Sequence, residues 1–273
     1  MSSFDNQRAG EGRLTEPAPA SPPPRQRELW TFRDLLLFLA FAAFSVFFSG
    51  LLVSSVYLQV HRAMGWRLPP PGFENSAFLL IALQLTAHAL LLGYIYFLIH
   101  VEYRRPFWDA LSWRRPSFAK ALAYILGGFL LAVLVEFAPQ FLPDKTTFPL
   151  QQFFATPEAA YATGAFAVFI APFMEELIFR GVLFTFFERF GGLTFAVILT
   201  ALLFAALHMG EYRGAWNHLL LILVVGLVFS LARGWSGSLA PSVILHSAYN
   251  LLMILGLYIS SDHFRTLPGL GFN

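Results

Sequence analysis

The sequence predicts an all-α protein, a polytopic transmembrane bundle of about seven to eight helices preceded by a disordered N-terminal tail. Of the 273 residues, 57% are hydrophobic and 12% are charged, and the mean hydropathy is +0.61. A typical soluble domain has about 25% charged residues. The hydrophobic residues are also gathered into long stretches without charge, so we expect the chain to be embedded in a membrane.

Residues 1–29 form the predicted tail, because they are polar and rich in Pro, Ser, Gly and Arg. Such a composition cannot bury enough apolar surface to offset the entropy of folding. The tail lacks the short apolar core and the small-residue cleavage site of a signal peptide. The first helix is therefore expected to be retained.

Residues 30–154 are expected to hold three spans, from charge-free stretches at 35–60, 75–101 and 121–135. A spanning helix needs about 20 apolar residues to cross about 30 Å of hydrocarbon with its backbone amides satisfied. The third stretch reaches this length only if it includes Glu136 and ends near Pro139 or Pro143. The loop at 102–118 interleaves tryptophans with arginines, which suits the inner membrane interface, although an ordinary loop explains it equally well.

Residues 155–260 are expected to form a second group of spans, from stretches at 159–174, 190–210, 214–232 and 234–261, with a short tail at 261–273. The first of these is too short unless its helix continues to about Arg189. That continuation would also bring Glu175 near mid-membrane, at the depth of His208. The pairs Gly127-Gly128 and Gly191-Gly192 indicate close helix packing or bends.

The basic residues predict a cytoplasmic N-terminus in the cytoplasmic (plasma) membrane, because positive charge gathers on the inner side. With that orientation thirteen of the 18 Lys and Arg residues lie inside: Arg8, Arg13, Arg25, Arg27, Arg33, Arg104, Arg105, Arg114, Arg115, Lys120, Arg180, Arg189 and Arg233. The other five lie outside: Arg62, Arg67, Lys145, Arg213 and Arg265. These arginines flank apolar spans, so the pI near 9.0 does not indicate nucleic-acid binding, and membrane lipids are the expected partners.

The segment around Glu175 carries three charges inside an apolar helix, where each costs at least about 2 kcal/mol. Glu176 and Arg180 are four residues apart, one helical turn, and can form an ion pair. Glu175 then points about 100° away from Glu176 and is left for a water molecule. A charge cluster at a helix end is the alternative interpretation.

Two further motifs place polar side chains on single faces of apolar helices. Phe204 and His208 are four residues apart, so the ring can pack beside the imidazole and limit water access. His246 and Asn250 have the same spacing, and both can donate hydrogen bonds to a developing carbonyl oxygen. Interhelical hydrogen bonding alone would also explain the second pair.

With these motifs the sequence resembles the CPBP family, which comprises CAAX-type (type II) prenyl endopeptidases and Abi-like proteins of bacteriocin processing or self-immunity. The resemblance rests on Glu175-Glu176-x-x-x-Arg180, Phe204-x-x-x-His208 and His246-x-x-x-Asn250, in that order. It covers roughly residues 155–260. The resemblance implies an intramembrane endopeptidase in which Glu175 and His208 activate water and His246 and Asn250 hold the oxyanion, supported by Glu176, Arg180 and Phe204.

Two alternatives stay open from the sequence. Zinc held by Glu175, His208 and His246 would also activate water, although metal-free activation is favoured because His-Glu-x-x-His is absent. A non-enzymatic immunity factor, scaffold or small transporter could use the same polar cluster. The chain has no cysteine, which excludes a cysteine nucleophile and thiolate zinc sites. The expected substrate is a membrane-associated peptide or lipidated protein, and no feature of the sequence indicates an oligomeric state.

Overall fold

The computed structural model describes residues 29–65, 76–138, 154, 156–210 and 215–266, and these contain helices and no strand. The all-α prediction is therefore confirmed for them, whereas the predicted tail, except for its last residue, lies outside the described residues. The N-terminal group comprises α1 (Phe32–Ala63), α2 (Ala77–Phe97) with its π-helical end η2 (Leu98–Glu102), the short α3 (Phe107–Ala110) and α4 (Phe118–Phe137). As expected, Glu136 lies within the third long helix. Pro139 and Pro143 lie outside the described residues.

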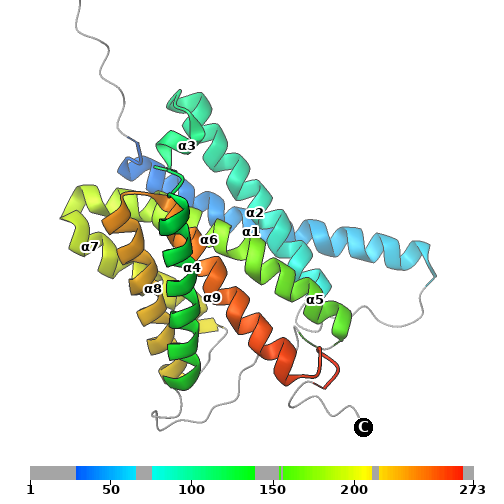
Figure 1. The fold of residues 1–273 in the computed structure, drawn as a ribbon. Coiled ribbons are helices and arrows are strands. Elements are labelled where there is room, and N and C mark those ends of the chain that lie inside the picture. Colours follow the sequence, from blue (N-terminus) through cyan, green and yellow to red (C-terminus); the bar gives the residue numbers. More distant parts are fainter. Residues whose placement is uncertain (1–28, 66–75, 139–153, 155, 211–214, 267–273) are drawn as a thin grey trace, which may run out of the picture.

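The C-terminal group begins with one long helix whose hydrogen-bond pattern alternates between α and π. Its parts are α5 (Pro157–Ala165), η5 (Phe166–Ile170), α6 (Ala171–Glu176), η6 (Leu177–Leu183) and the first part of α7 (Phe184–Leu207). After α7 come the 3₁₀ turn η7 (His208–Gly210), α8 (Trp216–Ser236) and α9 (Leu239–Ser260). Figure 1 shows the long helix crossing the molecule from α5 through α6 to α7.

Within the described residues, six helical stretches are long and apolar enough to cross a membrane. One of them, Pro157–Gly210, has 54 residues and would measure about 80 Å if straight. It is broken at Gly192, whose φ of 76° is a left-handed conformation that favours glycine. The helix before this bend continues through Arg189, as predicted, so the described residues hold six candidate spans, one of which is divided into two arms at Gly192.

The N-terminal end of α1 is fastened to the end of α2. Thr31 and Asp34 form a capping box, and the hydroxyl of Tyr103 donates a hydrogen bond to the buried Asp34 carboxylate. Burial and this hydrogen bond raise the pKa of Tyr103 to about 12. The contact joins two helices that also pack against each other.

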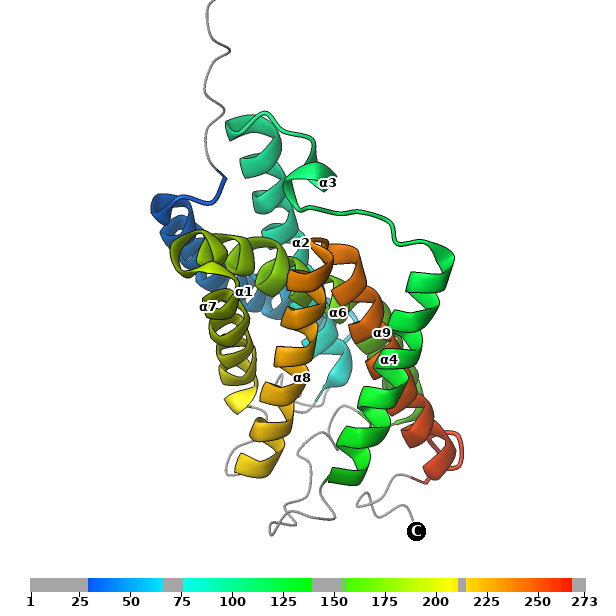
Figure 2. The same cartoon turned by 60° about the vertical axis from the view of Figure 1, so that its left-hand side comes forward.

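Helix α9 is the central element of the C-terminal group, because it contacts α4, α6 and α8, as Figure 2 also shows. Its closest neighbour is α4, at Gly128. A Cβ atom on Gly128 would lie 2.4 Å from the carbonyl oxygen of Leu245, whereas one on Gly127 would meet nothing within 4 Å. The predicted close packing is therefore a property of Gly128 and not of Gly127.

The loop between α2 and α4 is held against the start of α9. The amide of Arg114 donates to Oγ of Ser238 at 3.0 Å, and that hydroxyl donates to the carbonyl of Arg114 at 3.1 Å. The amide of Leu239 donates to the carbonyl of Ser112 at 3.2 Å. These bonds fix the loop over the same helix that carries His246.

Candidate functional site

The centre of the site is the carboxylate of Glu176, which is fully buried. Its Oε1 accepts a hydrogen bond from Nη1 of Arg180 at 2.8 Å and lies 3.0 Å from Nδ1 of His246. The predicted ion pair is thus formed within one helical turn, and the long helix is joined to α9 through the same oxygen. An ionised carboxylate paired in this way escapes the large cost of an isolated buried charge.

Arg180 is as buried as its partner, and α8 satisfies the rest of its guanidinium. Nη2 donates to the carbonyl of Gly226 at 2.7 Å, and Nε donates to Oγ of Ser230 at 3.2 Å. The guanidinium carbon lies 4.8 Å from the centre of the Phe204 ring and 5.5 Å from that of Phe229. The arginine therefore connects three helices in an aromatic enclosure that holds its charge away from lipid.

The hydrogen bond to Glu176 determines which ring nitrogen of His246 carries the proton and which nitrogen faces Glu175. An ionised carboxylate only accepts hydrogen bonds, so Nδ1 of His246 must carry the proton. Nε2 then points to the second carboxylate, 3.9 Å from Oε2 of Glu175. Glu175 is 23% exposed where Glu176 is fully buried, so the two neighbouring carboxylates lie in different environments, as their 100° separation predicts.

His208 lies at the C-terminal end of α7, beside the Phe204 ring. The two ring centres are 4.7 Å apart, which confirms the expected pairing, and Nδ1 of His208 is 2.8 Å from the Phe204 carbonyl. A carbonyl accepts, so Nδ1 carries the proton and Nε2 of the neutral ring is an acceptor. The same Phe204 ring lies 6.0 Å from the ring of His246, between the two histidines.

The Gly192 bend divides the chain between Glu175 and His208 into two arms of similar length. Glu175 precedes Gly191 by 16 residues, and His208 follows Gly192 by 16 residues, which is a rise of about 24 Å in both helices. The two residues therefore lie at similar distances from the bend along its two arms, and no interaction of the described residues joins their side chains.

Asn250 is bound to the long helix by a carbonyl that the local backbone leaves without a donor. The amide of Ala171 bonds to the carbonyl of Phe166 in the π pattern, and Pro172 has no N–H. The carbonyl of Ala167 accepts instead from Nδ2 of Asn250 at 2.7 Å. One N–H of the Asn250 amide is thereby used, and the second remains available.

Several residues of the site are not distinguished by the sequence motifs. Arg233 is 4% exposed, and its Nε donates to the carbonyl of Arg180 at 3.1 Å. Ser230 lies 3.0 Å from Oγ1 of Thr200, which extends the polar network to α7. Gly226 and Ser230 are four residues apart on an apolar helix, and this spacing was the available signal for a polar face on α8.

The zinc alternative can be tested on the donor geometry. A catalytic zinc site needs three protein ligands that converge at about 2.0–2.2 Å from one point. The part of the chain that the structure describes contains no group of three His, Asp or Glu side chains placed to hold a metal. Nδ1 of His246 is bonded to Glu176. No interaction of the described residues joins His208 directly to Glu175 or His246. The arrangement of Glu175, His208 and His246 in this structure does not fit a zinc ion.

Comparison with known proteins gives one match. Residues 157–252 match the family model described as type II CAAX prenyl endopeptidase, Rce1-like, whereas no curated protein and no solved structure matches the chain. The matched segment runs from the start of α5 into α9 and includes the three motifs. The resemblance that these motifs indicated is therefore confirmed, and it supports a CAAX-type intramembrane protease function in general.

Proposed function

We propose that this integral membrane protein, whose residues 157–252 belong to the type II CAAX prenyl endopeptidase family, hydrolyses peptide bonds within the membrane by glutamate-activated water. The observation that carries the proposal is the difference in burial and bonding between two adjacent carboxylates. Glu176 is fully buried and holds Arg180 and His246. Glu175 is partly exposed and faces Nε2 of His246, so it is the carboxylate left for chemistry.

In the proposed reaction Glu175 takes a proton from a water molecule while the water oxygen attacks the scissile carbonyl carbon. Nε2 of His208, as an acceptor, orients the second water hydrogen. When the carbon–nitrogen bond breaks, Glu175 passes its proton to the leaving amine. General base catalysis of this kind contributes about 10²–10⁴-fold.

The developing oxyanion would be held by His246 and by the second N–H of Asn250, each aligned donor being worth about 3 kcal/mol. This role has a condition. Because Nδ1 of His246 already donates to Glu176, Nε2 can donate only when the ring is an imidazolium. Glu176 and Glu175 face the two ring nitrogens of His246, at 3.0 Å from Nδ1 and 3.9 Å from Nε2.

The proposed substrate is a prenylated protein whose C-terminus carries a Cys-a-a-X sequence. The family match supports this substrate class, and so does the location of the site in apolar helices, where a lipid-modified cysteine can approach through the bilayer. Cleavage after the modified cysteine would release a peptide of three residues with a free carboxylate.

The test is cleavage of a quenched fluorescent farnesylated peptide by the purified protein in lipid vesicles. Glu175→Gln should reduce the rate by about 100-fold or more, because the amide cannot accept the proton. Glu158→Gln is the matched control, since Glu158 is an exposed residue at the start of α5 in the same long helix, and it should retain full activity.

Three results would contradict the proposal. An inert wild type would remove the prenyl-protein substrate, and full activity of Glu175→Gln would remove the assigned base. Ion flux through the vesicles that survives Glu175→Gln would instead favour a transporter. A zinc chelator should leave cleavage unchanged, because the donor geometry does not suit the metal.

A further inference from the structure

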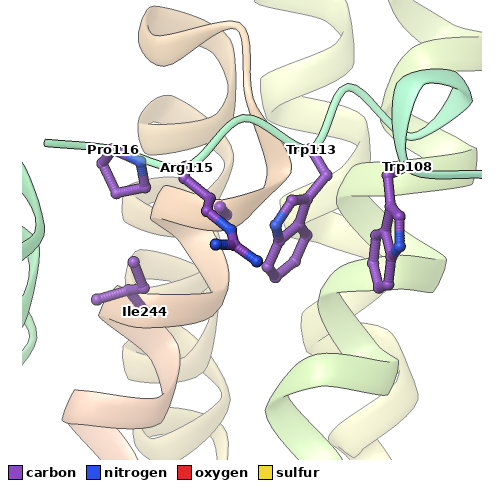
Figure 3. A pocket seen from close by; sticks show the side chains of 6 residues that line it. Trp108, Trp113, Arg115, Pro116 and Ile244 are labelled. Atoms are coloured by element: carbon purple, nitrogen blue, oxygen red, sulfur yellow. The ribbon is translucent and has the colours of Figure 1, made fainter.

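A hollow of about 510 Å³ lies beside the site, between α3 with the loop that follows it and the first turns of α9. It is lined by Trp108, Trp113, Arg115, Pro116, Ala240 and Ile244. Figure 3 shows Arg115 and Trp113 directed from the loop toward α9, with Trp108 beside them. The mechanism proposed above does not use this hollow.

The hollow combines one cation with an apolar, aromatic wall. Arg115 is the one charged residue of its lining, its side chain is exposed, and no acidic side chain of the described residues forms an ion pair with it. The rings of Trp108 and Trp113 are 5.2 Å apart, and Trp113 packs on Phe173 of α6 at 6.2 Å. A guanidinium without a partner beside apolar walls suits a carboxylate attached to an apolar group.

The loop that carries Arg115 has a fixed position relative to the catalytic residues. Arg114, the preceding residue, is bonded through its backbone to Ser238 at the start of α9. Trp113 contacts Phe173, two residues before Glu175 on α6. One wall of the hollow belongs to α9, which carries His246, and the other is held against α9 and α6 by these contacts, so a molecule in the hollow has a fixed position relative to Glu175 and His246.

The distance along α9 from the hollow to His246 matches the length of the peptide that cleavage is expected to release. Ala240 in the hollow precedes His246 by six residues, which is a rise of about 9 Å. Three residues in an extended conformation span about 10 Å. A peptide whose scissile carbonyl lies at His246 would thus bring its C-terminal end, three residues on, to the level of the hollow.

We propose that this hollow is the binding site for the C-terminal residue of the substrate. Arg115 binds the free carboxylate, and Trp108 and Trp113 contact the last side chain. The inference rests on the proposed function and goes beyond it, because it assigns the residue that recognises a free C-terminus. It makes the enzyme select a substrate end in place of an internal peptide bond.

The experiment compares two farnesylated peptides that differ only in a C-terminal carboxylate or carboxamide, each with wild type, Arg115→Gln and Arg114→Gln, in vesicles of neutral lipid and in vesicles with anionic lipid. Wild type should cleave the acid with a kcat/KM about 10-fold above that of the amide, chiefly through KM, as expected for one charge-assisted hydrogen-bonded contact. Arg115→Gln should lose this preference and cleave both peptides at the rate of the amide. Arg114→Gln removes the same charge from the adjacent exposed residue and should keep the preference.

Other outcomes separate the alternatives. Equal cleavage of acid and amide by wild type would overturn the carboxylate site while leaving the proposed function intact, whereas cleavage of neither peptide would overturn both. If Arg115→Gln slowed both peptides equally, and only in vesicles with anionic lipid, Arg115 would be a lipid headgroup site and the inference would be wrong. Unchanged thermal unfolding of Arg115→Gln checks that the variant is folded, which its exposure and lack of partners lead us to expect.

Discussion

Replacement of Arg180 by methionine tests the charge network on which the site depends. Methionine keeps much of the volume and removes the guanidinium. The side chain is fully buried and donates to Glu176, Gly226 and Ser230 at 2.8, 2.7 and 3.2 Å. Each of these groups loses a donor in the variant, and only Glu176 is left with a charge.

The expected loss of stability is the sum of the free-energy contributions of these contacts. Removing one partner of a buried ion pair costs about 3–5 kcal/mol. The hydrogen bonds to Gly226 and Ser230 are donated by a cation and contribute about 1.5–3 kcal/mol each, but the Gly226 carbonyl keeps the Ser230 hydroxyl as a donor at 2.8 Å, so we count only one of them. The total of about 4.5–8 kcal/mol is a large part of the stability of an ordinary protein, which is about 5–15 kcal/mol.

A second variant separates the charge from the packing. Glu176→Gln keeps an acceptor for His246 and removes the anion that Arg180→Met leaves unpaired. The double variant should therefore be more stable than the sum of the two single effects predicts, by at least about 2 kcal/mol. The assay is reversible unfolding of the four proteins in mixed micelles with increasing SDS. An Arg180→Met protein within about 1 kcal/mol of wild type, or additive single effects, would refute the reasoning.

Two further predictions concern the scaffold. Gly128→Ala should destabilise by about 1–3 kcal/mol through the clash with Leu245, whereas Gly127→Ala should lie within about 0.5 kcal/mol of wild type; equal thermal unfolding of the two would contradict the close approach of α4 to α9. For Tyr103, a folded-state pKa of about 12 against an unfolded value near 10 means that its contribution to stability is present below about pH 10 and is lost as the pH rises toward 12. Absorbance titration of wild type against Tyr103→Phe should show this late ionisation, and a difference curve centred near pH 10 would show that the bond to Asp34 is absent.

The helices and the ion pair were predictable because they follow from spacing within one segment. Charge-free length identified the spans, and the charges of Glu175, Glu176 and Arg180 required a helix that continued to Arg189. The bend at Gly192 and the close approach at Gly128 agree with the expected roles of two glycine pairs. In these cases the structure depends on residues that are close together in the sequence, so it can be predicted from the sequence alone.

The contacts between helices were not predictable in the same way. Spacing of four places His246 and Asn250 on one face of a helix, but it does not say which groups that face meets. In the structure His246 bonds to Glu176 and Asn250 to the carbonyl of Ala167. The second contact depends on a π-helical turn, which changes the hydrogen-bond partner of each amide and has no simple sequence signature. The catalytic roles of these residues stay predictions until the variants are measured.

The location of Glu176 one helical turn before Arg180 has a consequence for membrane insertion during synthesis. A ribosome delivers the helix with Glu175, Glu176 and Arg180 before the chain has reached Gly226, Ser230 and His246, which lie 46 to 70 residues later. Charged residues at the centre of a helix hinder its transfer from the translocon into lipid. Because Glu176 lies one turn from Arg180, two of the three charges neutralise each other inside the nascent segment. Insertion of this helix should therefore cost less than insertion of a helix with three unpaired charges, and α8 and α9 supply the remaining hydrogen bonds after they are synthesised.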